Sequence, residues 1–346
     1  MKPYGSIDSM SKRLTPPSAH DVARVAGVSQ AAVSRAFTPG ASIAKNTQDK
    51  VFRAAKSLGY RPNLHARSLI SGKSGIVGVV IGRPLNAVMM TALDALSSRL
   101  SRADKHILVF TAEGNSTADV HVEDLLKYRV DAVLLMATSV STKLAEQCCD
   151  EGIPVICFNR RPRKTKDFVS ISGNNREGGR QIAEHLVQQG YRRIALMAGF
   201  AESSTGRERE SAFSAYLTSN GLSLPEREVG HCERAGAVQA ARILLARKPR
   251  PDAIFCANDD MALATIEVAR YEFGLEIGRE IGIAGFDDIE EASWPSFNLT
   301  TYSLPVGTMI EKAADIVLST TRSEHPAHEI VAGALQARRS TQRSPR

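Results

Sequence analysis

The sequence predicts an α/β protein in which a small all-α N-terminal unit precedes two lobes, each built on a doubly wound parallel sheet. Two observations support this fold class. Residues 18–58 contain three short helical patterns, and the first two meet at a single glycine. From residue 75 onward, apolar runs of strand length alternate with longer amphipathic segments, which is the arrangement of parallel strands with crossover helices.

The positive charge of the chain is concentrated near its N-terminus. The formal net charge is +7, but residues 1–75 contain twelve Lys or Arg against three Asp, so residues 76–346 sum to −2. Such asymmetry favours an anionic polymer or a membrane surface as the partner, although a merely solvated basic tail has the same composition. An apolar fraction of 43% is enough to bury substantial cores.

Neither export nor a catalytic use of cysteine is indicated. The first thirty residues contain no apolar signal segment, and no run approaches eighteen apolar residues, so we expect a cytoplasmic protein with no membrane partner. The cysteines are odd in number and lack the paired spacing of metal ligands, so we expect reduced packing residues and no metal site. They are Cys148, Cys149, Cys157, Cys232 and Cys256.

The first helix has clear start and stop signals. Ser18 and Asp21 have the spacing of a capping box, in which each side chain bonds the other residue's backbone N–H. Val22 and Val25 share the apolar face of this helix. Gly27 suits the left-handed backbone position that ends a helix.

A second and a third helix follow directly. Ser29 is placed to cap the second helix, and its apolar residues can face inward. The polar outer side then consists of Gln30, Ala31, Ser34 and Arg35. Residues 47–58 place apolar side chains at i, i+3, i+4 and i+7, and Gly59 ends this third helix.

Three short helices, the first two joined by a tight glycine turn, match the helix-turn-helix arrangement. In that motif the second helix enters the major groove of DNA. The alternative is a small bundle that covers a larger domain, but it does not explain a polar outer face on the second helix within a strongly basic segment. The pattern therefore favours DNA binding.

The remainder of the chain predicts two lobes with a cleft between them. Parallel sheets bind ligands beyond the carboxyl ends of their strands, and two such sheets that face each other make a cleft. The predicted strands of the first series are residues 75–82, 106–112, 130–137 and 153–159; those of the second are 193–199, 252–259 and 281–287, and 299–304 and 329–335 close the chain.

Four stretches carry a family resemblance: HDVARVAGVSQAAVSRAF, LGYRPNLHARSLISGKS, FCANDDMALA and GIAGFDDI. Together they resemble the lactose-repressor/galactose-repressor (LacI/GalR) family of bacterial transcription regulators, from about residue 16 to 340. The lobes alone also resemble periplasmic sugar-binding proteins. The helix-turn-helix pattern and the lack of a signal segment favour the regulators.

The resemblance implies a division into three parts. These are a DNA-binding domain at 16–62, a hinge helix and linker at 63–74, and an effector-binding and dimerisation domain at 75–340. Within the last part, the first lobe is expected at about 75–172 and 302–327, and the second at about 173–301 and 328–340.

The resemblance also implies which residues contact DNA. Residues 29–37 correspond to the recognition helix, with Gln30 and Ala31 at base-reading positions. Residues 63–70 correspond to a hinge helix in the minor groove, where Leu69 would wedge between base pairs; the alternative is an ordinary apolar linker residue. The expected contacts are Ser29, Gln30, Ala31, Ser34, Arg35, Asn63, His65, Ala66, Arg67 and Leu69.

Polar residues follow several predicted strands, where hydroxyl-rich ligands need donors and acceptors. The alternative is that these Asn and Asp side chains cap the following helices. The resemblance implies Arg209, Asn258 and Asp287 as effector contacts, with Asn86, Asn159, Arg160 and His231 as weaker candidates; a solvated surface arginine is the alternative for Arg209. The sequence departs from the family at Ala44, a usual Ser cap, and at residues 86–89, where NAVM lacks the usual aromatic rings.

Two other classes of function fit less well. An enzyme is disfavoured because SGKSG at 71–75 lacks the first glycine of a phosphate loop, whose position Arg67 occupies. A ligand-binding module without DNA would leave the basic helices without a role. We therefore expect a transcription regulator without cofactors, a repressor that binds a pseudo-palindromic DNA operator as a homodimer and responds to a sugar or sugar acid. The sequence does not specify the effector, the operator or the regulated genes. Nor does it decide between repressor and activator, or whether the effector is inducer or corepressor.

Overall fold

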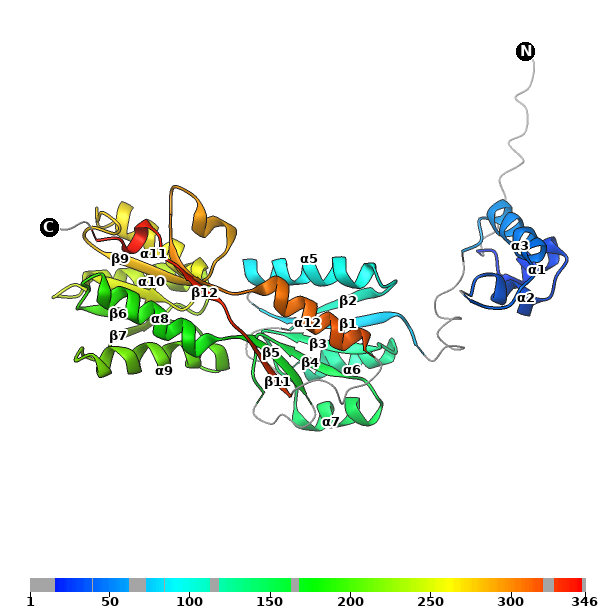
Figure 1. Ribbon diagram of the computed structural model, residues 1–346, viewed down its shortest axis with the longest axis horizontal. Helices are drawn as coiled ribbons and strands as arrows, with labels where there is room; N and C mark the ends of the chain where they lie inside the picture. The colour runs from blue at the N-terminus through cyan, green and yellow to red at the C-terminus, as the bar shows by residue number, and fades with distance from the viewer. Residues whose placement is uncertain are drawn as a thin grey trace, which may run out of the picture. The chain divides into compact units, whose positions relative to one another are not determined.

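The computed structural model describes residues 16–38, 40–61, 73–83, 85–112, 118–162, 168–319 and 327–343. The chain divides into two compact units, Met1–Ser74 and Gly75–Arg346 (Figure 1). Within the described residues, no helix is both long enough and apolar enough to cross a membrane.

The N-terminal unit contains three helices among its described residues: α1 (Ala19–Ala26), α2 (Gln30–Ala36) and α3 (Lys45–Leu58). The capping box predicted at Ser18 and Asp21 is present in full, with a 3.0 Å bond from the Ser18 N–H to the Asp21 carboxylate. Gly27 has a φ of 66°, the left-handed conformation that glycine adopts without strain. Ser29 caps α2 by accepting a hydrogen bond from the Ala32 N–H at 3.2 Å.

A small core holds these helices together. Val22, Val33 and Val51 are at most 1% exposed, so each helix contributes one fully buried valine. The prediction that Val25 shares the apolar face was wrong: this side chain is 53% exposed, because only a narrow stripe of so short a helix reaches the core. Ala44 makes no side-chain cap, as expected, and α3 begins two residues earlier than predicted.

The described residues of the second unit form two six-stranded sheets. The order in the first sheet is β11-β5-β4-β3-β1-β2, and all its pairs are parallel; the second has the order β12-β10-β9-β8-β6-β7, parallel except for the β10–β12 pair. The first sheet contains β1 (Ile76–Gly82), β2 (His106–Ala112), β3 (Ala132–Met136), β4 (Val155–Phe158), β5 (Val169–Gly173) and β11 (His328–Val331). The second contains β6 (Ile194–Ala198), β7 (Glu226–Val229), β8 (Ala253–Cys256), β9 (Gly282–Asp287), β10 (Thr300–Ser303) and β12 (Ala334–Gln336).

Helices cover both faces of each sheet, which confirms the predicted doubly wound architecture (Figure 1). The first lobe packs α5 (Ala87–Ser101) and α12 (Val306–Leu318) on one face, and α6 (Asp119–Lys127) and α7 (Thr142–Asp150) on the other. The second lobe packs α10 (Arg234–Ala246) and α11 (Asp259–Tyr271) on one face, and α8 (Asn175–Gln188) and α9 (Ser204–Ser219) on the other.

The lobe boundaries near the C-terminus need correction. Residues 329–335 were predicted as one strand of the second lobe, but β11 pairs with β5 of the first lobe and only β12 pairs within the second. Conversely, β10 lies wholly in the second sheet, so residues 302 and 303 belong to the second lobe. The physical reason is that one extended segment of the chain passes from one sheet edge to the other around Gly333.

In the part of the chain that the structure describes, three segments cross between the lobes, after β5, after β10 and after β11, and they lie against one another. The Asn174 N–H bonds the Val331 carbonyl at 3.0 Å. A Cβ on Gly173 would lie 2.2 Å from a Leu304 methyl carbon, and one on Gly333 would lie 2.1 Å from the Ser303 carbonyl oxygen. Glycine is therefore required where the crossings touch.

Close packing of α8 against α9 generates a first prediction. A Cβ on Gly179 of α8 would lie 2.3 Å from the Arg209 carbonyl oxygen of α9, so Gly179→Ala must push the two helices apart. We expect this variant to lose about 1–3 kcal/mol of unfolding free energy. Gly307→Ala is the matched control, because nothing lies within 4 Å of its new Cβ. Urea denaturation of both variants tests this, and equal stability of the two would contradict it.

Candidate ligand cavity and nucleic-acid interface

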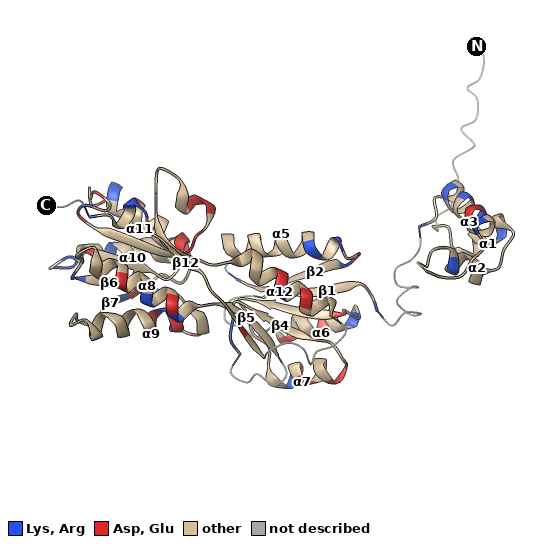
Figure 2. Cartoon of the chain, in the orientation of Figure 1, with Lys and Arg blue, Asp and Glu red and all other residues tan. Residues whose placement is uncertain are grey.

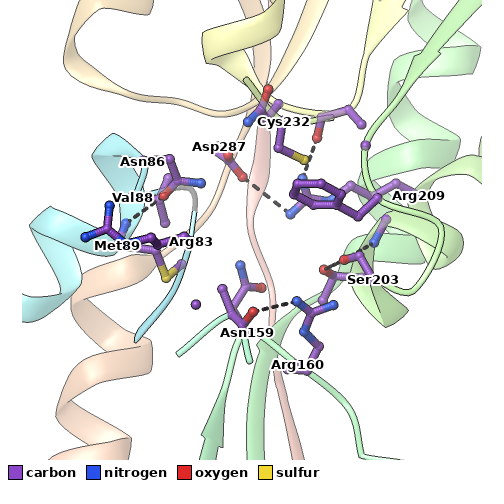
Figure 3. Close-up of a pocket in the computed structure, with 18 residues that line it drawn as sticks. Arg83, Asn86, Val88, Met89, Asn159, Arg160, Ser203, Arg209, Cys232 and Asp287 are labelled. Atoms are coloured by element: carbon purple, nitrogen blue, oxygen red, sulfur yellow. Dashed lines mark hydrogen bonds and ion pairs between the residues drawn. The ribbon is translucent and has the colours of Figure 1, made fainter. Parts of the chain in front are cut away.

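A cavity of about 90 Å³ lies between the two lobes of the second unit (Figure 3). Its walls are the segments that follow β1, β3 and β4 in the first lobe and β6, β7, β8 and β9 in the second. These segments all lie at carboxyl ends of parallel strands, where such sheets bind ligands. The cavity is thus in the place that the strand pattern predicted.

Arg209 is the most extensively bonded side chain of the cavity. It lies on α9 and is only 6% exposed. Its Nε donates to Asn175 Oδ1 at 2.8 Å, and its Nη1 donates to the Ala257 carbonyl at 2.6 Å. The guanidinium also lies 3.7 Å above the Phe286 ring, a cation–π geometry. Arg209 is therefore held rigidly and is not the solvated surface arginine that was the alternative.

Asp287 ends β9 and forms an ion pair with Arg209, with 3.4 Å between Oδ1 and Nη2 (Figure 3). Burial raises the pKa of the Asp287 carboxyl to about 8, although the Arg209 charge opposes this rise. Asp287 Oδ1 has no hydrogen bond within the described residues. A buried oxygen without a hydrogen bond is costly, so this atom is suited to accept one from a ligand.

Strained backbone marks the same strand ends. Ala137, Asn159, Cys232 and Asp287 all have positive φ angles, of 54°, 52°, 54° and 120°. All four line the cavity. Non-glycine residues rarely adopt such angles, and where they do they cluster at ligand-binding sites.

Asn86 and Asn258 combine the two roles that the sequence analysis treated as alternatives. Asn86 caps α5 by accepting from the Met89 N–H, and Asn258 caps α11 by accepting from the Met261 N–H, each at 3.0 Å. Both residues also line the cavity. Capping by the side-chain oxygen leaves each amide Nδ2 available as a donor to a ligand.

Asn159 and Arg160 follow β4 and line the first-lobe wall. Asn159 Oδ1 is buried and has no hydrogen-bond partner within the described residues. Arg160 donates from Nη2 to the Ala137 carbonyl at 2.7 Å. Figure 3 shows both side chains entering the site from below, away from Asp287.

The assignment of His231 is corrected by the structure. His231 is exposed and does not line the cavity, whereas the next residue, Cys232, does. The prediction of Cys232 as a packing residue is incomplete for the same reason, although all five cysteines are free and burial raises the pKa of this thiol. Five further residues line the cavity and were not predicted from the sequence: Arg83, Met89, Phe200, Ser203 and Thr205.

Basic residues of the N-terminal unit lie on each of its three described helices (Figure 2). Its described residues between 16 and 61 contain seven Lys or Arg and two Asp. Ser29, Gln30, Ala31, Ser34 and Arg35 are all exposed, which confirms the predicted outer face of α2. The predicted contacts in the hinge segment, namely Asn63, His65, Ala66, Arg67 and Leu69, lie outside the described residues.

Two family models match the chain. Residues 18–63 match the bacterial regulatory proteins of the lacI family, and residues 183–341 match the periplasmic binding protein-like domain. Similar proteins include the HTH-type transcriptional repressor PurR of Photobacterium profundum, 28% identical over 88% of this chain and 92% of PurR. The HTH-type transcriptional regulator AscG of Escherichia coli is 29% identical over 84% of this chain and 88% of AscG.

Solved structures match over nearly the whole chain. The lac repressor dimer bound to operator and the anti-inducer ONPF has a TM-score of 0.84 at 26% identity, covering 95% of this chain and 100% of that one. The transcriptional regulator CelR–cellobiose complex has a TM-score of 0.67 at 26% identity, covering 94% and 99%. The exposed α2 face, the inter-lobe cavity and these matches together show that the chain resembles the DNA-binding transcription regulators of the lacI family, whose model matches residues 18–63.

Proposed function

We propose that this regulator is a repressor that binds a pseudo-palindromic operator as a homodimer, and that a sugar or sugar acid in the inter-lobe cavity changes its affinity for DNA. The observation that supports this best is the combination, in one chain, of an exposed basic recognition helix with a cavity lined by a buried arginine–aspartate pair. The similarity to relatives named as repressors favours repression.

In the proposed DNA complex, α2 lies in the major groove. Arg35 is an exposed cation in the last turn of α2, where it can bond guanine or a phosphate. Gln30 at the start of α2 suits adenine, whereas Ala31 offers only an apolar contact to a thymine methyl group. Residues 63–70 would add minor-groove contacts through Leu69.

Two observations support the proposed homodimer. The related lac repressor structure is described as a dimer bound to operator. In addition, both lobes expose large apolar side chains: Met90 of α5 is 50% exposed in the first lobe, and Tyr271 of α11 is 83% exposed in the second. A dimer with two α2 helices would match an operator with two half-sites one helical turn apart.

The effector would bind between the lobes. Asp287 and Asn159 contribute buried oxygens that lack hydrogen bonds within the described residues, and Asn86 and Asn258 contribute amide donors. A hydroxyl group both donates and accepts, so a polyhydroxylated ligand satisfies both kinds of group at once. Because the cavity walls come from two lobes joined by three crossings, the ligand would favour the closed arrangement and so shift a two-state equilibrium.

A second prediction concerns DNA. Arg35→Ala should weaken specific operator binding and leave stability unchanged, because the side chain is exposed and outside the core. We expect a loss of about 1–3 kcal/mol in discrimination between operator and random DNA. Arg53→Ala, an exposed arginine on α3, is the matched control. Fluorescence titration with operator and with random duplex tests this, and unchanged operator affinity in Arg35→Ala would refute it.

A third prediction concerns the coupling between the two sites. Arg209→Ala should abolish both effector binding and the effector-dependent change in DNA affinity, which in the wild type should be about 5- to 150-fold. DNA affinity without effector should persist. Calorimetry for the effector and titration for DNA measure the two effects, with Arg207→Ala as control because Arg207 is exposed on the same helix. A preserved response in Arg209→Ala would place the effector elsewhere.

A fourth prediction concerns pH. Because burial raises the pKa of Asp287 in the folded protein, the folded state binds more protons than the unfolded state between about pH 4 and 8. The contribution of Asp287 to stability therefore falls as pH rises through this window, by up to about 1.4 kcal/mol per pH unit. Asp287→Asn should lose this slope.

Thermal unfolding of wild type and Asp287→Asn without ligand, at intervals from pH 6.5 to 8.5, provides the measurement. Titration of Asp259 does not affect this comparison, because burial raises the pKa of Asp259 only to about 6 and both proteins contain this residue. The difference in melting temperature should shift in favour of Asp287→Asn as pH rises. A constant difference would mean that Asp287 stays ionised throughout.

A further inference from the structure

We propose that the ligand of the inter-lobe cavity contains an anionic group, a carboxylate or a phosphate, and that Arg160 is the residue that pairs with it. This proposal rests on the proposed function, in which the cavity holds the effector. It narrows the effector from a sugar or sugar acid to a polyhydroxy acid or a sugar phosphate. It also assigns the preference for an anionic ligand to the first-lobe wall.

The bonding of Arg160 is incomplete. A guanidinium has five N–H donors. Within the described residues, the side chain of Arg160 makes a single hydrogen bond, from Nη2 to the Ala137 carbonyl at 2.7 Å, and no ion pair with a carboxylate. It lines the cavity (Figure 3). Burial, and to a smaller extent Arg207, lower the pKa of Arg160, whereas Glu202 favours the charged form.

Arg209 does not offer the same opportunity to an anion. Its Nη2 lies 3.4 Å from Asp287 Oδ1, and its Nε and Nη1 already bond Asn175 and the Ala257 carbonyl. All three guanidinium nitrogens of Arg209 therefore already face protein acceptors, so the second-lobe wall suits hydroxyl groups. The guanidinium with unused donors is on the first-lobe wall, where the partly buried Arg160 forms no ion pair with a described carboxylate.

Helix ends add to the positive potential. Three helices of the described chain begin at the cavity, and their capping residues Asn86, Ser203 and Asn258 all line it. The N-terminus of a helix favours an anion through its free N–H groups and its dipole. The start of α9 lies close to Arg160, because the neighbouring Arg161 N–H bonds Ser204 Oγ across the lobes at 2.9 Å.

The neighbour of Arg160 indicates what the rest of the ligand contributes. Asn159 Oδ1 is buried without a hydrogen bond from any described residue, so it needs a donor, which an ionised carboxylate does not supply. A hydroxyl group close to the anionic group supplies one. The geometry thus points to a ligand whose acid group faces Arg160 and whose hydroxyl groups face Asn159 and Asp287.

The test compares matched ligands on matched variants of the full-length protein. Thermal shift and calorimetry are performed at constant ionic strength with D-gluconate, D-glucuronate and D-glucose 6-phosphate, with D-glucose as the neutral counterpart and inorganic phosphate as a minimal anion. The proteins are wild type, Arg160→Gln, Arg160→Lys and Arg207→Gln. Arg207→Gln removes an equal charge from an exposed residue nearby that does not line the cavity.

We expect at least one anion, or inorganic phosphate alone, to stabilise wild type and Arg207→Gln more than D-glucose does. Arg160→Gln should weaken that binding by about 10- to 100-fold, and Arg160→Lys by less, because the charge is retained. The melting temperature of each variant without ligand shows that it folds. If no anion distinguishes wild type from Arg160→Gln, or if D-glucose binds wild type as tightly as the acids do, the proposal is wrong.

DNA affinity in the same samples separates this proposal from the proposed function. A neutral sugar that binds and changes DNA affinity would leave the proposed function intact and overturn the anion assignment. Anion binding that depends on Arg160 but leaves DNA affinity unchanged would support the anion site and contradict its role as the effector site.

Discussion

The ligand cavity depends on the burial of one guanidinium. Arg209 connects four elements of the second lobe, because it bonds Asn175 at the start of α8, the carbonyl that follows β8 and the carboxylate at the end of β9, and it stacks on Phe286. Breaking a buried ion pair costs several kcal/mol, so these elements must keep their relative positions. The absence of a Cβ on Gly179 permits α9 to approach α8 closely enough for this arrangement.

The sequence predicted the elements whose signals are local. Capping residues and glycines predicted the ends of α1 and α2 to within one residue, because an N-cap or a left-handed turn depends only on a few residues adjacent in sequence. It missed β5 and β7, since β5 alternates serine with Val169 and Ile171, and β7 is the charged edge strand Glu226–Val229. Both serines of β5 are buried, and Ser170 bonds His328 of β11. The alternation in β5 is too short to distinguish a strand by itself, and its pairing with β11 depends on residues far away in the chain.

The same distinction applies to the candidate site. Polar residues directly after apolar strands, such as Asn159, Asn258 and Asp287, could be predicted because parallel sheets bring strand ends together. The choice between His231 and Cys232 could not, since both have positive φ and only the three-dimensional turn decides which side chain points inward. Phe200 and Met89 also line the cavity from segments without a distinctive polar pattern.

The distribution of charge over the two walls determines how a ligand can act. The second lobe offers an arginine whose guanidinium nitrogens already face protein acceptors, whereas the first lobe offers a cation with one protein acceptor among the described residues. A ligand that engages only one wall binds open and closed arrangements equally and cannot shift their equilibrium. A ligand with both hydroxyl groups and an acid group engages both walls only when the lobes are close. Its two kinds of group thus supply the differential affinity on which regulation depends.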